Sequence, residues 1–302
     1  MFNEDQPTYL PPAKRILVIG DVHGDLGRLT QSLIALHVIT SSLEWVAEPR
    51  DTIVVQMGDQ VDSRSRDGRD GREGGEWERV PDIEVLNFMN FLDKIARVGG
   101  GRALSMIGNH ELMNVVGDFT YVSDRSMQLT PHRAAHFLPG GAIASLLAKR
   151  NIVLKIGSCI FCHGGLLPRH LGKSLLHINM VARKFLRNEA INLPMEREIL
   201  VEDIMCSENG ILWTRAYSLP EDAVGGIEDA DIDEVLEITH AKRIITGHNT
   251  VSKIQCIRDG RIWLTDAMFS RAYGSFGSDM VQVLELINDG NGARVLGIKT
   301  RD

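Results

Sequence analysis

Five short apolar runs in this chain each end beside a glycine and an ionisable or amide side chain. The runs read ILVI, IVVQM, ALSMI, CIFC and RIIT, and they are followed by GDVHGD, GDQVD, GNHE, HGG and GHN. Short runs rich in β-branched residues predict buried strands. Ligands of open α/β sheets bind outside the carboxyl ends of the strands, so the five segments predict one common site at one edge of the fold.

The spacing of apolar residues predicts helices between these strands. Segments 26–39, 81–98, 175–190 and 231–240 have helical periodicity, and Pro81 is a helix-start signal. Helices alternating with strands indicate parallel βαβ units. The C-terminal runs RIWLTDA, DMVQVLELIND and GARVLGIKT are instead strands joined by Gly and Asp turns. They predict an antiparallel extension of an α/β fold.

We expect a single domain over residues 1–302 with two stretches outside its core. Residues 1–14 are interpreted as a flexible N-terminal segment. Residues 63–80 are rich in Arg, Gly and acidic side chains and contain too few apolar residues for a core element, which predicts a mobile loop. This loop is either a solvated insertion or a flap that contacts substrate, because it follows a charged motif.

The composition argues against two classes of partner. The net charge of −7 and the pI near 5.8 disfavour a broad nucleic-acid-binding surface. No run approaches the roughly 20 apolar residues that span a bilayer. The first residues, MFNEDQPTYLPPAKR, lack the basic start and apolar stretch of a secretory signal, so we expect no membrane partner and a cytoplasmic location.

The cysteines are interpreted as structural thiols in a reducing compartment. Cys159 and Cys162 have the CxxC spacing of a zinc knuckle or a redox motif. No second CxxC completes a zinc site, and the pair lies in an apolar run that reads as a strand. Buried thiols without a redox role are typical of such a context.

The polar clusters together predict a metal site. A single Gly-Asp after a strand is usually a turn with a helix cap, and Asp25 is interpreted as such an N-cap. The five clusters jointly supply three carboxylates, one amide and four imidazoles, which are costly to gather without compensation. Oxygen and nitrogen donors without thiolates suit Mn, Fe, Zn or Mg, and so many ligands favour two ions with a bridging carboxylate. The donors are Asp21, His23, Asp59, Asp62, Asn109, His110, His163 and His248.

In this order, the five motifs resemble the phosphoprotein phosphatase (PPP) family within the calcineurin-like metallophosphoesterases, from about residue 15 to about residue 275. The stretch DAMFSRAYG (266–274) is most similar to bacterial-type Shewanella-like protein phosphatases. The resemblance implies a fold of two mixed β-sheets packed as a sandwich and flanked by helices.

The resemblance also implies roles for individual residues. The first metal ion would be held by Asp21, His23 and Asp59. The second would be held by Asp59, Asn109, His163 and His248, with Asp59 as the bridge. His110 corresponds to the family's proton donor, and Asp62 matches the carboxylate that orients it.

The phosphate-binding arginines depart from the commonest pattern of the family. The family often reads GDxVDRG, whereas GDQVDSR places Ser63 after the orienting Asp and Arg64 one residue later. Arg64 is the expected phosphate ligand, with Arg66 as the alternative. Arg215, at the end of ILWTR, stands where bacterial-type members carry a phosphate-binding arginine.

The expected function is hydrolysis of phosphate monoesters on proteins. A hydroxide activated by two divalent metal ions would attack phosphorus, with His110 as the general acid, and Mn is the expected metal. An alternative with the same metals is hydrolysis of a nucleotide or a dinucleoside polyphosphate. A non-enzymatic alternative is an inert scaffold of the same fold. The motifs leave the choice between phosphoserine/phosphothreonine and phosphotyrosine open, since loops 63–80 and 114–140 are expected to set it. They also leave the oligomeric state open.

Overall fold

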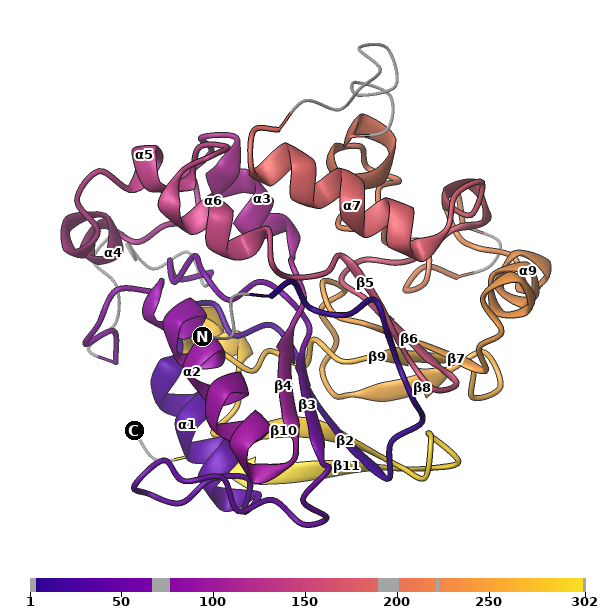
Figure 1. Cartoon of the computed structure of the whole chain (residues 1–302), viewed down its shortest axis with the longest axis horizontal. Helices are drawn as coiled ribbons and strands as arrows, with labels where there is room; N and C mark the ends of the chain where they lie inside the picture. The colour runs from indigo at the N-terminus through magenta and orange to yellow at the C-terminus, as the bar shows by residue number, and fades with distance from the viewer. Residues whose placement is uncertain (1–3, 67–76, 190–200, 221–222, 301–302) are drawn as a thin grey trace.

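The computed structural model describes residues 4–66, 77–189, 201–220 and 223–300. In these parts the strands form two mixed sheets (Figure 1). The six-stranded sheet has the order β1-β5-β6-β7-β9-β8, and the five-stranded sheet has the order β11-β10-β2-β3-β4. The fold class expected from the sequence is confirmed.

The expected strands are present, with ends that agree with the predicting runs to within a few residues. The five-stranded sheet contains β2 (Arg15–Ile19), β3 (Ile53–Gln56), β4 (Arg102–Ser105), β10 (Met280–Ile287) and β11 (Gly292–Lys299). The six-stranded sheet contains β1 (Tyr9–Leu10), β5 (Val153–Ile156), β6 (Cys159–Cys162), β7 (Arg243–Thr246), β8 (Gln255–Ile257) and β9 (Ile262–Leu264). Strands β2, β3 and β4 are parallel, whereas β10 is antiparallel to both β2 and β11. The predicted antiparallel extension is therefore confirmed for β10 and β11.

The four expected helices are also present. They are α1 (Leu26–Ala35), α2 (Glu84–Gly99), α7 (Leu175–Leu186) and α9 (Asp229–Thr239). Asp25 caps α1 as expected, because its carboxylate accepts the Arg28 N–H at 3.0 Å. Four shorter helices were not predicted: α3 (Asn109–Val115), α4 (Asp124–Leu129), α5 (Arg133–Phe137) and α6 (Ala142–Leu147). The remaining helical turns are η2 (Pro168–His170), η3 (Glu202–Cys206) and η4 (Arg271–Phe276). No helix among the described residues is long and apolar enough to cross a membrane.

Alternating side chains pack the two sheets into layers. Ile16 and Val18 point to the interior shared with the other sheet, where they join Leu154 and Phe161 in one buried cluster. Leu17 lies on the opposite side of β2, in a second cluster that α1 and α2 cover (Figure 1). This arrangement follows from the period-2 geometry of strands, because successive residues face opposite sides of a sheet.

The outer face of the six-stranded sheet is covered in the same way. Ile160 and Cys162 pack in a third cluster with Leu147 of α6, Ile178 of α7 and Ile232 of α9. The four cysteines are free, and the CxxC pair is split between two faces of β6, since Cys159 belongs to the interior cluster. Burial raises the pKa of both thiols in this pair. These observations support the interpretation of the pair as packing residues.

The structure shows contacts in the described parts of both stretches that were expected to be flexible. Residues 1–14 were expected to be flexible, but Tyr9 and Leu10 form β1, whose register pairs them with Lys155 and Ile156 of β5. In the expected mobile loop 63–80, residues 67–76 lie outside the described residues. The described ends are fixed by buried polar contacts, because the hydroxyl groups of Ser63 and Ser123 both donate to Glu78. Hydrogen bonds therefore hold the described ends of this loop in place, although its sequence has no apolar pattern.

Candidate active site

The five polar segments converge at the carboxyl ends of the parallel strands, as the sequence predicts. Asp21, Asp59 and Asn109 follow β2, β3 and β4 of one sheet, whereas His163 and His248 follow β6 and β7 of the other. A cavity of about 510 Å³ opens between them. Its lining consists of Asp21, His23, Asp59, Arg66, Asn109, His110, Met113, Asp118, Thr120, Tyr121, Trp213, Arg215, His248, Thr250 and Tyr273.

Asp59 occupies the centre of this site in a strained backbone conformation. Its φ is +52°, in the left-handed region that non-glycine residues rarely adopt. The buried carboxylate of Glu111 holds the strained loop, because it accepts the backbone N–H groups of Asp59 at 2.9 Å and of Gln60 at 2.7 Å. It also accepts the Gly108 N–H at 2.7 Å, which ties the GNHE segment to the GDQVD segment.

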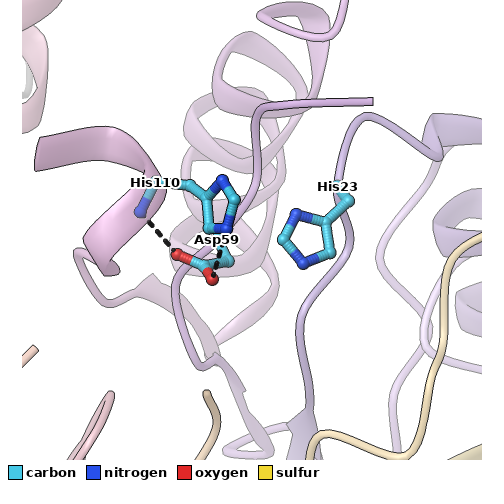
Figure 2. A group of neighbouring side chains, drawn as sticks. All are labelled: His23, Asp59 and His110. Atoms are coloured by element: carbon cyan, nitrogen blue, oxygen red, sulfur yellow. Dashed lines mark hydrogen bonds and ion pairs between the residues drawn. The ribbon is translucent and has the colours of Figure 1, made fainter. Parts of the chain in front are cut away.

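Imidazole groups approach the Asp59 carboxylate from two sides. One set of potential ligand atoms, from His23, Asp59 and His110, lies within 4.8 Å of one another (Figure 2). A second set, from Asp59, His163 and His248, satisfies the same distance. Burial alone would raise the pKa of Asp59, but His163 and His110 hold it well below its usual range. Asp59 is thus the one carboxylate shared by both sets.

Backbone carbonyl groups orient the three predicted histidine ligands. His163 directs Nδ1 at the Met57 carbonyl oxygen at 2.8 Å, and its Nε2 lies 2.9 Å from the Asn109 amide oxygen. His248 directs Nε2 at the Trp213 carbonyl oxygen at 2.9 Å, which leaves Nδ1 for a cation. Carbonyl groups that fix one ring nitrogen so that the other can bind a metal are typical of histidine sites.

His23 follows the same pattern on the other side of the cavity. Its Nδ1 lies 3.2 Å from the Val61 carbonyl oxygen, so Nε2 is the nitrogen left for a cation. Burial, and then the neighbouring Arg66, hold the pKa of His23 well below its usual range. The ring is therefore neutral at pH 7, which is the form that binds metal ions.

Asp21 supplies the clearest sign that a cation fits this site. Its Oδ1 is buried and has no hydrogen-bond partner among the described residues, whereas Oδ2 accepts the backbone N–H of His248 at 3.0 Å. Burial, reinforced by the nearby carboxylate of Asp266, raises the pKa of Asp21 well above its usual range. An unsatisfied buried carboxylate oxygen beside a second carboxylate is costly, and a divalent cation removes that cost. The residues present therefore fit a pair of hard or borderline metal ions.

His110 and Asp62 form the expected pair. The Nδ1 atom of His110 lies 2.7 Å from Asp62 Oδ2, and its Nε2 lies 3.8 Å from Asp59 Oδ2. Burial alone would lower the pKa of His110, but Asp59 and Asp62 raise it above the usual value. The imidazole at the cavity is therefore biased toward its protonated form.

The arginines are placed differently from the expectation for Arg64. The Arg64 guanidinium donates to the Thr120 carbonyl oxygen at 2.8 Å, and Arg64 does not line the cavity. Arg66, the alternative, does line it, and its guanidinium lies 5.3 Å from the Tyr121 ring centre and 3.1 Å from His23 Nδ1. Arg215 lines the cavity as expected. Arg64 therefore lies outside the cavity lining, whereas Arg66 and Arg215 are part of it.

Sequence reasoning missed several residues of the cavity wall. Tyr121 and Trp213 bring aromatic surface to it; the sequence had indicated the loop 114–140 and the stretch ILWTR that contain them, but neither side chain was singled out. Tyr273 lies in DAMFSRAYG, and its hydroxyl donates to Asp266 at 3.0 Å. DAMFSRAYG served only as a mark of family resemblance, so it did not predict that Tyr273 lines the cavity.

Comparison with known proteins agrees with this geometry. The family model described as calcineurin-like phosphoesterase matches residues 14–251, which is most of the chain. The chain belongs to the calcineurin-like phosphoesterase family. This phosphoesterase is accordingly a metal-dependent hydrolase of phosphate esters, and the resemblance of its motifs to the calcineurin-like metallophosphoesterases is confirmed.

Individual relatives support the same assignment. The phosphoesterase is 27% identical over 293 residues to Shewanella-like protein phosphatase 2 of Arabidopsis thaliana, which covers 82% of this chain and 68% of the relative. It is 25% identical over 240 residues to Shewanella-like protein phosphatase 1 of Plasmodium berghei, which covers 78% of this chain and 60% of the relative.

Solved structures show the same fold. A cold-active protein-tyrosine phosphatase of a psychrophilic Shewanella species superposes with a TM-score of 0.73 and 23% identity, over 97% of this chain and 83% of that one. A protein serine/threonine phosphatase from Saccharomyces cerevisiae superposes with a TM-score of 0.55 and 14% identity, over 99% of this chain and 85% of that one.

Proposed function

We propose that this phosphoesterase is a cytoplasmic protein phosphatase of the PPP family that uses two divalent cations, with Mn²⁺ as the expected metal. The observation that carries the proposal is the cavity, whose wall combines oxygen and nitrogen ligands with His110 and two arginines. The names of the Arabidopsis and Plasmodium relatives support a phosphoprotein substrate. The free cysteines are consistent with a reducing compartment.

The metal ligands follow from the placements described above. One cation would be held by Asp21, His23 and Asp59, and the other by Asp59, Asn109, His163 and His248. Divalent cations in such a pair lower the pKa of a coordinated water and stabilise charge on phosphoryl oxygens. Mn²⁺ suits this mixed set of carboxylate, amide and imidazole donors; Fe, Zn and Mg are the other candidates.

His110 would protonate the leaving group. Because Asp62 accepts at Nδ1, Nε2 is the atom available to the substrate. As hydroxide bonds to phosphorus, the bond from phosphorus to the leaving oxygen breaks. The leaving oxygen takes the proton from His110 Nε2 and departs as an alcohol or phenol, and the phosphoryl group is released as phosphate. Asp62 stabilises the charged imidazole and fixes its orientation.

Arg66 and Arg215 would bind the phosphoryl oxygens. They line the cavity on different segments, and a guanidinium stays protonated and presents several N–H donors. Arg215 is anchored by its own N–H bond to the His248 carbonyl oxygen at 3.2 Å. Charge that develops on the phosphoryl group is stabilised best by donors that are already in position.

The test is turnover of para-nitrophenyl phosphate by the purified chain with added Mn²⁺. We expect turnover by the wild-type protein and a loss of about 10²–10⁴-fold in His110→Asn. His240→Asn is the matched control, because His240 is exposed and has a left-handed backbone that Asn also adopts. If the wild-type protein turned over no substrate with Mn, Fe, Zn or Mg, the result would contradict the proposal and favour the scaffold alternative.

A substrate panel separates a protein phosphatase from a nucleotide hydrolase. Phosphopeptides should be hydrolysed with a higher kcat/KM than nucleotides or dinucleoside polyphosphates. The reverse order would establish the nucleotide alternative. The same panel compares phosphotyrosine with phosphoserine and phosphothreonine.

The aromatic wall favours phosphotyrosine in this comparison. Tyr121 packs edge-on against His110 with ring centres 5.0 Å apart and is 40% exposed. An aromatic ring beside the general acid can pack against a phenyl leaving group, and such pairs contribute about 0.5–1.5 kcal/mol. Tyr121→Leu should therefore reduce kcat/KM for phosphotyrosine peptides several-fold more than for phosphoserine peptides. Tyr9→Leu, on the exposed strand β1, is the control.

A further inference from the structure

A buried polar chain connects the candidate general acid to a helix that lines no part of the cavity. Its members, besides His110, are Asp62, Asp82, Asn114 and Arg133, and each is at most 2% exposed. Arg133 begins α5, a helix that no sequence motif marked. A charged network this deep in the interior is costly unless its geometry satisfies the polar atoms.

Arg133 satisfies two acceptors at once. Its guanidinium donates to both carboxylate oxygens of Asp82, at 2.6 and 2.8 Å. The third direction is used by Nε, which donates to the Asn114 amide oxygen at 2.7 Å. The Phe137 ring centre lies 4.9 Å from the same guanidinium. This planar group is held on every edge, which a lysine could not reproduce.

Both contacts lead from Arg133 to Asp62, and Arg133 Nη2 itself lies 3.6 Å from Asp62 Oδ1. Asn114, oriented by Arg133, donates from Nδ2 to Asp62 Oδ1 at 2.8 Å. Asp82, also oriented by Arg133, accepts the backbone N–H of Asp62 at 2.8 Å. Asp62 has a left-handed backbone with φ of +72°, so its position depends on such contacts. With Oδ1 occupied, Oδ2 is the atom that remains for His110.

We propose that Arg133 is a positioning residue for the reaction, which acts on Asp62 directly and through Asn114 and Asp82 and so holds Asp62 against His110. The proposal rests on the proposed function, because it assigns work to the proton donor of that mechanism. Through these contacts, Arg133 of α5 would keep His110 Nε2 directed at the leaving oxygen. Arg133 itself touches neither substrate nor metal ligands.

The leaving group provides the test. Phenyl phosphate needs a proton on its leaving oxygen, whereas dinitrophenyl phosphate releases a stable anion. Arg133→Lys keeps the charge beside Asp82 but removes the fork and the Nε contact. We expect it to lower kcat/KM for phenyl phosphate by about tenfold or more and to leave dinitrophenyl phosphate nearly unchanged.

Two further variants separate positioning from general loss of structure. Arg183→Lys is the matched control, because Arg183 is also buried but donates to Asn151 and to the Gln6 carbonyl oxygen instead of to Asp82 and Asn114. It should leave the ratio of the two rates unchanged. Asn114→Ser removes the Asn114 amide contacts to Asp62 and Arg133 but leaves the pair of Arg133 with Asp82 intact. It replaces Arg133→Lys in the test if that variant does not fold.

A double-mutant cycle completes the experiment. Asp62→Asn should show the same selective loss, and adding Arg133→Lys to it should cost nothing further, because both act on one proton donor. Equal losses on both esters, or additive losses in the double variant, would overturn the inference. A wild-type protein inactive on both esters would instead contradict the proposed function.

Discussion

The candidate bridging ligand is held in place by protein groups alone. Asp59 adopts a left-handed backbone conformation, and its Oδ1 accepts the backbone N–H of His110 at 2.9 Å. Glu111 fixes the same loop by accepting the backbone N–H groups of Asp59 and Gln60 within 3.0 Å. The fourth letter of GNHE thus has a structural role that spacing could not reveal, because the groups it binds belong to a segment about 50 residues earlier.

Exchange of Asp59 should affect both metal positions. Asp59→Asn removes the only carboxylate shared by the two ligand sets of the described residues, so it should lower the content of both ions. Asn109→Ala removes an amide oxygen on the His163 side and should mainly affect one ion. Elemental analysis after dialysis against Mn²⁺ measures this. Two ions per chain in Asp59→Asn would contradict the bridging assignment.

Gly108 is a residue whose missing side chain makes room for that carboxylate. A Cβ at Gly108 would collide with Oδ1 and the backbone nitrogen of Asp59. Gly108→Ala should therefore displace Asp59 and reduce kcat/KM by about 10²-fold, in line with the effect of a 1 Å misplacement. Gly172→Ala is the control, because no atom lies within 4 Å of its added Cβ. Unchanged activity of Gly108→Ala would refute the packing argument.

At the scale of elements, strands and long helices were predictable and short helices were not. Runs such as RILVI (15–19) and the two-faced pattern of α2 specify their elements locally. Helices α3 to α6 have five to seven residues, too few for a helical period to emerge, and their neighbours decide their form. Arg66 and Arg133 were therefore placed by tertiary contacts. The positions of the candidate metal ligands were predictable, because each lies in the segment that follows a strand.

The hairpin of β10 and β11 should respond to acid through one buried carboxylate. Glu285 of β10 accepts from Arg15 of β2 at 2.6 Å and from Arg294 of β11. Burial alone would raise the pKa of Glu285, but Arg294 and Arg15 hold it below its usual value. A depressed folded-state pKa stabilises the fold above the unfolded pKa of about 4.3, and this contribution is lost as the pH falls through the folded value.

Glu285→Gln tests this contribution. The variant should melt a few degrees below the wild type at pH 7, and the difference should shrink as the pH drops below about 4. Thermal melts of the metal-free proteins at several pH values measure it. Glu44→Gln is the control, because Glu44 lies in an exposed turn. A difference that stays constant with pH would show that lost packing, and not lost charge, destabilises the variant.

At the scale of the whole molecule, the site joins the two sheets. Asp21, Asp59 and Asn109 extend from the five-stranded sheet, and His163 and His248 extend from the six-stranded sheet. Below them the sheets are held by the interior cluster around Val18 and Phe161, but at the carboxyl ends polar groups replace apolar ones. Cations in the cavity would therefore connect the sheets where the hydrophobic core ends.

Metal binding should accordingly stabilise the whole fold. Ligands that bind only the folded state stabilise it by about 2.7 kcal/mol at a hundred times Kd. After treatment with EDTA, added Mn²⁺ should raise the Tm of the wild-type protein by several degrees in a concentration-dependent manner. The shift should be much smaller in His163→Ala, which removes a ligand of one sheet, and in Asp21→Asn, which removes one of the other. His240→Asn should keep the full shift. If Mn²⁺ supported turnover without raising the Tm at saturating concentration, the ions would not connect the sheets, because a cation shared by both must resist their separation.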